Sequence, residues 1–152
     1  MKIWAFLAGA LLFVGCSGAA TTAQPTTTGS FGQRSAADLE RGKALFERHC
    51  VSCHSTTRPK DRSKMVAPPI SGVMFHIKER FKNRDEAIAF IVDYIPHPTR
   101  EKAICPSVRR FGLMPAMNLP KEDLEAIAEH LWENYPPAGF VHPKTGPKMN
   151  TP

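Results

Sequence analysis

One short motif constrains this chain more than any other feature: residues 50–54 read CVSCH. At the end of a helix, Cys50 and Cys53 lie about one turn apart on one face, where both thiols can form thioether bonds to the vinyl groups of a haem. His54 follows directly and can present its imidazole to the iron. The motif therefore predicts one covalent haem c, which also suits a chain of 152 residues, because small domains often need a staple to hold one fold.

Two other kinds of site use paired cysteines. A structural zinc site needs two further ligands at similar spacing, and the sequence has no second C-x-x-C and no H-x-x-x-H. A thioredoxin-like redox pair needs a βαβ context, and no strand alternation accompanies the motif. Haem attachment is therefore the favoured interpretation.

The N-terminus predicts export from the cytoplasm. Lys2 precedes an apolar run from Ile3 to Val14 that is too short to cross a bilayer comfortably. The following residues resemble a bacterial lipobox ending at Cys16, although Phe13 stands where Leu is usual. We expect residues 1–15 to be a lipoprotein signal peptide and Cys16 to be lipidated, on the periplasmic side of a bacterial membrane. Ordinary cleavage further on, giving a soluble periplasmic protein, is the alternative.

Both ends of the mature chain have the composition of non-globular segments. Residues 16–37 are poor in large apolar side chains and show no periodicity, which predicts a flexible tether after the lipidated Cys16. Residues 136–152 are rich in proline, and we expect this tail to wrap the surface or to stay mobile. The globular domain is therefore predicted to span residues 38–135.

This central region resembles the class I cytochromes c. Residues 38–50, DLERGKALFERHC, resemble the family's N-terminal helix, with Gly42 and Phe46 at the expected offsets before C-x-x-C-H. Residues 111–119, FGLMPAMNL, resemble its methionine loop, and residues 124–135 its closing helix. The resemblance implies an all-α fold of about four helices around one haem. It also implies that the first and last helices cross at Gly42, where the family packs a glycine against an aromatic side chain. In this chain His130 stands at the position of that aromatic.

The resemblance further implies that Met114, which Pro115 follows, is the second axial ligand of the iron. Met117 is the nearest rival, since the family usually has a packing aromatic there. His76 and His97 could instead give bis-histidine ligation, although packing or surface roles suit them better. The loop at Pro68 resembles the wall on the histidine side of the haem, where a neighbouring carbonyl could accept a hydrogen bond from the ligand imidazole.

Hydrophobic periodicity predicts four amphipathic helices and no strand. Besides the first, apolar stripes run along residues 70–81, 88–95 and 124–135. Asn83 is the predicted N-cap of the third helix, and the fourth is predicted to open at Pro120. Cys105 is left over once the other three cysteines have roles, and we expect it to be a buried structural residue rather than an intermolecular disulfide.

The formal net charge of +6 suits acidic redox partners or anionic lipid, and no nucleic-acid motif is present. Basic residues flank both haem motifs.

With both axial positions filled by protein, the iron offers no open site for substrate, so we expect a single-electron carrier without enzymatic activity or small-molecule substrate. The alternatives are a haem-based gas sensor or ligand-binding module, a peroxidase-like enzyme, and an electron-entry subunit of a larger oxidoreductase. The flanking basic residues are Arg58, Lys60, Arg62, Lys64, Arg109 and Arg110.

Overall fold

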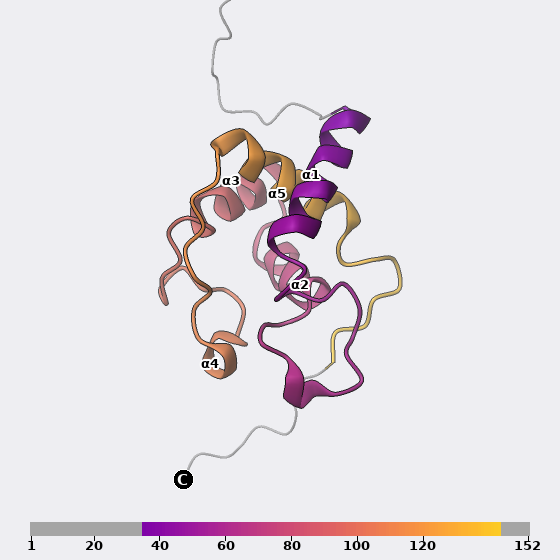
Figure 1. Ribbon diagram of the computed structural model, residues 1–152, viewed down its shortest axis with the longest axis vertical. Helices are drawn as coiled ribbons and strands as arrows, with labels where there is room; N and C mark the ends of the chain where they lie inside the picture. Colours follow the sequence, from indigo (N-terminus) through magenta and orange to yellow (C-terminus); the bar gives the residue numbers. More distant parts are fainter. Residues whose placement is uncertain (1–34, 144–152) are drawn as a thin grey trace, which may run out of the picture.

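The computed structural model describes residues 35–143, and these residues fold entirely into helices and loops (Figure 1). The predicted signal peptide, the lipidation site Cys16, nearly all of the tether and the last nine residues of the tail lie outside this range. Among residues 35–143 no helix combines the length and the apolar character needed to cross a membrane. The helices, in chain order, are α1 (Ala36–His49), the 3-10 turn η1 (Arg62–Lys64), α2 (Ile70–Arg80), α3 (Arg84–Tyr94), α4 (Val108–Phe111) and α5 (Lys121–Asn134).

The four predicted amphipathic helices correspond to α1, α2, α3 and α5. Asn83 caps α3 as expected, because its side chain accepts hydrogen bonds from the backbone N–H groups of Asp85 and Glu86. Pro120 stands at the N-cap of α5, also as expected. The short elements η1 and α4 were not predicted, since three or four residues are too few to show a hydrophobic period.

Helices α1 and α5 cross at Gly42, as the family resemblance implied. A Cβ at this position would overlap the backbone carbonyl of Ala126 and would lie 3.0 Å from the Cβ of His130, so only glycine allows the two backbones this approach. His130 is buried, with 7% of its surface exposed. Its ring lies 5.9 Å from that of Phe46, so it takes the packing role of the expected aromatic.

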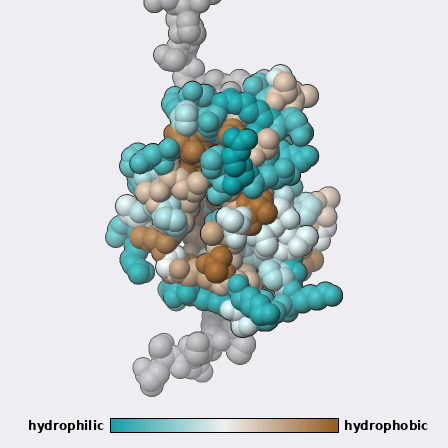
Figure 2. All heavy atoms as spheres, in the orientation of Figure 1, coloured by the Kyte–Doolittle hydropathy of each residue, from teal (hydrophilic) through white to brown (hydrophobic). Residues whose placement is uncertain are grey.

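The core lies between α1, α2, α3 and α5, and apolar side chains border a hollow in the middle of the face shown in Figure 2. Helix α5 packs against both α1 and α3 in the upper half of Figure 1, while η1 and α4 lie in the lower half. Most of the buried side chains come from the predicted stripes, and Met74, Ala87 and Ala128 join them. The core consists of Phe46, Ile70, Met74, Ile77, Ala87, Ile88, Ile91, Ile95, Leu124, Ile127, Ala128 and Leu131.

Candidate functional site

The C-x-x-C-H motif forms a tight turn directly after α1. Cys50 is the C-cap residue, and its N–H donates to the Phe46 carbonyl at 2.9 Å. The N–H groups of Cys53 and His54 both donate to the Cys50 carbonyl, at 3.1 and 2.8 Å. Both thiols are free, Cys50 half-buried and Cys53 exposed. Burial, and then the nearby Cys53 thiol, raises the pKa of Cys50 to about 11, so this sulfur is protonated at neutral pH.

His54 is oriented by the proline loop, as the family resemblance implied. Its Nδ1 lies 2.8 Å from the Pro68 carbonyl oxygen. Because a carbonyl can only accept, Nδ1 donates, and the lone pair is left on Nε2, the nitrogen available to a metal. Burial lowers the pKa of His54, although the bond to Pro68 opposes this, which favours the neutral imidazole that an iron ligand requires. The Ile70 N–H, which donates to the Ser55 carbonyl at 3.0 Å, holds the loop in place.

The methionine loop begins where α4 ends at Gly112, whose φ of 78° suits only glycine. Met114 and Met117 are both half-buried and pack against the core. The Met117 N–H donates to the Ile95 carbonyl at 3.1 Å, which ties the loop to the end of α3. Because both methionines pack against the core, this contact does not show which of them is the better candidate for the iron ligand.

The two alternative histidine ligands make other contacts. The His97 side chain is 69% exposed, with Nδ1 3.7 Å from an Asp93 carboxylate oxygen at the surface. His76 lies in an aromatic cluster with Phe75 and His142, its ring centroid 4.6 Å from that of His142. Among residues 35–143 no group of three or more His, Cys, Asp or Glu side chains is placed to hold a metal ion.

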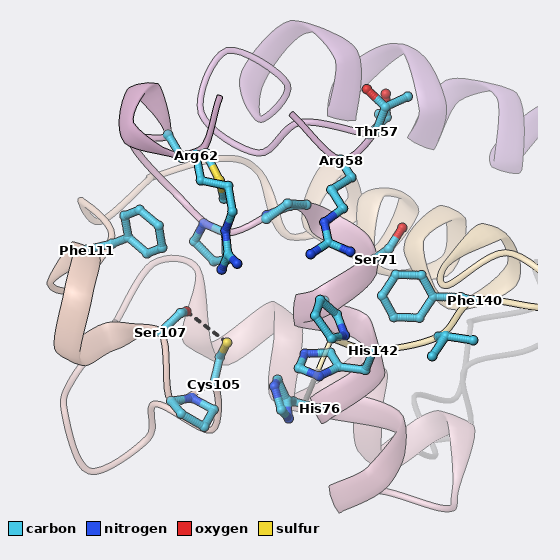
Figure 3. A pocket seen from close by; sticks show the side chains of 18 of the residues that line it. Thr57, Arg58, Arg62, Ser71, His76, Cys105, Ser107, Phe111, Phe140 and His142 are labelled. Carbon is cyan, nitrogen blue, oxygen red and sulfur yellow. Dashed lines mark hydrogen bonds between the residues drawn. The ribbon is translucent and has the colours of Figure 1, made fainter. Parts of the chain in front are cut away.

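A cavity of about 670 Å³ opens in the lower half of the molecule, and we call it the η1–α4 cavity (Figure 3). It is bordered by η1, α2, α4 and the C-terminal segment 137–143. Cys50, Cys53, His54 and Met114 do not line it, but Pro68 does. The residue whose carbonyl orients His54 therefore also forms part of this cavity's wall.

Sequence reasoning missed this cavity. Phe140 and His142 come from the proline-rich tail, which folds back over α2 so that the His142 ring stacks on Phe75 at 4.6 Å. Cys105 is half-buried rather than buried, and its Sγ lies 2.8 Å from Ser107 Oγ on the cavity wall. The aromatic residues in the tail were the one available signal.

The residues present fit a covalently held haem c. Two thiols share one turn, and the adjacent imidazole is held by Nδ1 with Nε2 left as its donor atom. A thioether side chain from a separate loop is the kind of second donor that haem iron accepts in cytochromes.

Comparison with known proteins agrees with this chemistry. Residues 37–131 match the family described as cytochrome c oxidase, cbb3-type, subunit III. The chain belongs to this family of c-type cytochromes. The class I cytochrome c assignment, the all-α fold and the covalently bound haem c are thereby confirmed, and so is electron transfer as the general function.

Three relatives were found among curated proteins. An uncharacterized protein of Aquifex aeolicus is 31% identical over 114 residues, which cover 64% of this chain and 75% of the relative. Photosystem II extrinsic protein V of Aphanothece halophytica is 34% identical over 101 residues, 62% of this chain and 58% of the relative. The same protein of Cyanidium caldarium is 31% identical over 109 residues, 61% of each. The cytochrome thus spans less than two thirds of the two photosystem proteins. No solved structure matches it significantly.

Proposed function

We propose that this cytochrome is a single-electron carrier on the periplasmic side of a bacterial membrane, with Cys50 and Cys53 attaching the haem and His54 and Met114 ligating its iron. The observation that carries the proposal is the 2.8 Å contact between His54 Nδ1 and the Pro68 carbonyl, which leaves Nε2 as a neutral donor. When bound, haem c supplies one-electron iron chemistry. The protein's part is to hold the two donor atoms, and the Met114 thioether favours the reduced state and a relatively high potential.

The ligation is tested by visible spectra of the ferric holoprotein. We expect Met114→Ala to abolish the methionine-to-iron charge-transfer band. Met117→Ala is the matched control, since this methionine is also half-buried in the same loop, and it should keep the band. Loss of the band in the Met117 variant alone, or its absence from the wild type, would contradict the assignment. Tight carbon monoxide binding by the reduced wild type at neutral pH would favour a gas sensor instead.

Lipid anchoring through Cys16 is part of the proposal. Mass spectrometry of the mature protein from a bacterial host should find a diacylated N-terminal cysteine, and Cys16→Ser should release the protein from membranes. An unmodified N-terminus beyond residue 16 would mean a soluble periplasmic carrier.

Acidic redox partners are proposed for the basic surface around η1 and α4. Arg110 Nη2 donates to the Arg62 carbonyl at 2.7 Å, so the basic segments that flank the two haem motifs meet. Positive charge here would steer acidic partners and make association weaken with salt. Lys64→Gln with Arg109→Gln should lower the rate with an acidic donor protein at low ionic strength. An unchanged rate that is also independent of salt would contradict this docking site.

A place within a larger complex is the second candidate. The matching family is described as an oxidase subunit, and two of the relatives are extrinsic proteins of photosystem II. Gentle detergent extraction of native membranes followed by native electrophoresis tests this. Co-migration of the haem stain with a much larger species would favour an electron-entry subunit, whereas migration at the size of the free chain would favour a shuttle.

A further inference from the structure

His130 is a buried, ionisable side chain at the crossing of α1 and α5 (Figure 1). Its ring lies 5.9 Å from that of Phe46 and 6.0 Å from that of Tyr135, which it meets edge-on. Its Cβ lies 3.0 Å from the place that a Cβ on Gly42 would occupy. A charge on this ring would therefore stand between two closely packed helices, where water solvates it poorly.

Hydrogen bonds from Asn134 determine which nitrogen of His130 carries the proton. Asn134 Nδ2 donates to the His130 carbonyl at 2.9 Å and lies 3.2 Å from His130 Nδ1. Because the amide nitrogen can only donate, Nδ1 is the acceptor and the proton of the neutral ring is on Nε2.

A second proton on the ring is incompatible with this arrangement. It would bind to His130 Nδ1 and place an N–H group opposite the donor of Asn134. Rotating the amide would bring Asn134 Oδ1 to Nδ1, but the same rotation would remove the donor from the His130 carbonyl. Protonation therefore costs this site one of its two hydrogen bonds.

Charged and titratable groups face His130 from α1 and from the end of α5. A pocket of about 500 Å³, which we call the α1–α5 pocket, opens beside the ring and is lined by Glu40, Lys43 and Glu47 of α1. All three are exposed, and Lys43 Nζ lies 3.4 Å from Glu40 Oε1. Tyr135 also lines the pocket, and burial, followed by Glu47, raises its pKa, so the phenol stays neutral where an imidazole titrates.

The balance of these effects keeps His130 neutral at neutral pH. Burial lowers the pKa of His130, and Lys43 lowers it further, whereas Glu47 and Glu40 oppose the shift. The two carboxylates are exposed, so water screens their attraction for a charge on the ring.

Phe46 connects this ring to the haem-attachment turn. Its side chain is 1% exposed and packs on His130, while its backbone carbonyl accepts from the Cys50 N–H at 2.9 Å and from the Val51 N–H at 3.3 Å. A movement of the His130 ring therefore acts on the residue that holds the beginning of the C-x-x-C-H turn.

We propose that His130 is a pH-sensitive switch in the crossing of α1 and α5. The neutral ring accepts from Asn134 and packs on Phe46, which keeps the crossing closed. The protonated ring loses that bond and moves into the α1–α5 pocket, toward Glu40 and Glu47, which loosens the end of α1 that carries Cys50.

The direction of the response follows from which state binds the proton more readily. Above pH 6.5, the ordinary pKa of a histidine, neither the closed nor the open crossing binds it, so the equilibrium between them is unaffected. As the pH falls below 6.5, the open crossing binds the proton first, because water reaches the ring there, and opening becomes more favourable.

Hydrogen–deuterium exchange of the reduced holoprotein at pH 7 and pH 5 tests the proposal. Each rate is expressed as a protection factor, which removes the intrinsic pH dependence of exchange. We expect the protection factors of α1, including that of the Cys50 N–H, to fall about fivefold or more between pH 7 and pH 5. His130→Phe keeps a ring at the crossing without a titratable nitrogen, and it should remove most of this fall.

His97→Phe is the matched control, since it makes the same replacement at an exposed histidine and should retain the whole fall. Asn134→Asp is the second variant. It places a carboxylate beside Nδ1, so the protonated ring gains an acceptor and the fall should again be lost. This variant decides the test if His130→Phe does not fold.

Nitrogen-15 NMR of the His130 ring at pH 7 tests the starting state, and we expect the proton on Nε2. A proton on Nδ1 would overturn the proposal. So would wild-type protection factors in α1 that are equal at the two pH values, or a fall that persists undiminished in the folded His130→Phe and Asn134→Asp variants.

Discussion

At the scale of single residues, Gly42 decides how closely α1 and α5 approach. The position has no room for a side chain, because the Ala126 carbonyl occupies the place of a Cβ. That carbonyl belongs to helix backbone and cannot move aside without displacing α5. The close crossing of α1 and α5 therefore requires a residue without a Cβ at position 42.

We therefore expect Gly42→Ala to lower the free energy of unfolding by about 2 kcal/mol or more, within the usual range for overpacking. Gly72→Ala is the control within the same chain, since it too replaces a glycine in a helix. At Gly72 a Cβ would meet only the His142 imidazole, at 3.8 Å, so alanine should be neutral or stabilising by up to about 1 kcal/mol. Urea unfolding of the two variant holoproteins measures the difference. Equal changes in unfolding free energy would mean that the helices can move apart at Gly42 at little cost.

A second residue-scale feature is the ion pair between Arg84 and Glu129, which joins the start of α3 to α5. The Glu129 side chain is fully buried, and that of Arg84 is 25% exposed. Arg84 also contacts Asp85 at 3.0 Å and Glu133 at 3.7 Å. Removing one partner of a buried pair leaves a charge in a place where water cannot solvate it.

Arg84→Met should accordingly destabilise the protein by about 3 kcal/mol. Arg41→Met removes the pair between the exposed Arg41 and the half-buried Asp123, and it should cost less than Arg84→Met because Asp123 keeps some contact with water. Chemical denaturation at neutral pH measures both. Comparable losses would indicate that Glu129 stays solvated or takes up a proton at little cost.

At the scale of elements, α1 and α3 both begin with side-chain caps. Ser35 and Asp38 form a reciprocal capping box at α1. At α3, Asn83 Oδ1 accepts from the N–H groups of Asp85 and Glu86 at 2.8 and 3.2 Å. The acidic residues in the first turn of α3 add a favourable interaction with the helix dipole.

Asn83→Ala is expected to cost about 1 kcal/mol of stability, because two backbone donors lose their acceptor. Asn83→Asp keeps an oxygen in the same place and should retain most of the stability. Thermal unfolding of the two variants beside the wild type gives the comparison. A full loss in the aspartate variant would argue that the amide group, rather than the cap, matters.

At the scale of the whole molecule, the segment 137–143 closes the fold over α2. The Phe140 N–H donates to the Pro137 carbonyl at 3.1 Å, and Gly139 has a φ of 76°, so the chain turns back. Phe140 and His142 then pack on Phe75. Burial, and secondarily the neighbouring His142, lowers the pKa of His76, whereas Glu79 opposes this shift.

This arrangement predicts acid sensitivity. The pKa of this histidine is lower in the folded protein than its ordinary value of 6.5. Above pH 6.5 neither state binds the proton, so the free energy of unfolding is unaffected. As the pH falls below 6.5, the unfolded chain binds the proton first, so the free energy of unfolding decreases. His76→Gln should therefore lessen the fall in unfolding free energy between pH 7 and pH 5. The exposed His97 provides the control, and His97→Gln should leave that fall unchanged. Urea unfolding at pH 7 and pH 5 measures both variants. A smaller fall for His97→Gln than for His76→Gln would contradict the prediction.

The local parts of this protein followed from its sequence. Hydrophobic periodicity and cap residues act within a few positions, so four helices, the Asn83 cap and the C-x-x-C-H turn could be placed before any tertiary contact was known. The carbonyl that orients His54 was predictable through the family resemblance of the proline loop.

Only tertiary structure decided the contacts between distant residues. Arg110 and Arg62 lie 48 positions apart, and Arg84 and Glu129 lie 45 apart, so no local pattern pairs them. The η1–α4 cavity depends on a tail whose composition predicted no element, because a few aromatic side chains become ordered only when α2 offers them a surface. Chain entropy opposes such contacts until the helices have been brought together.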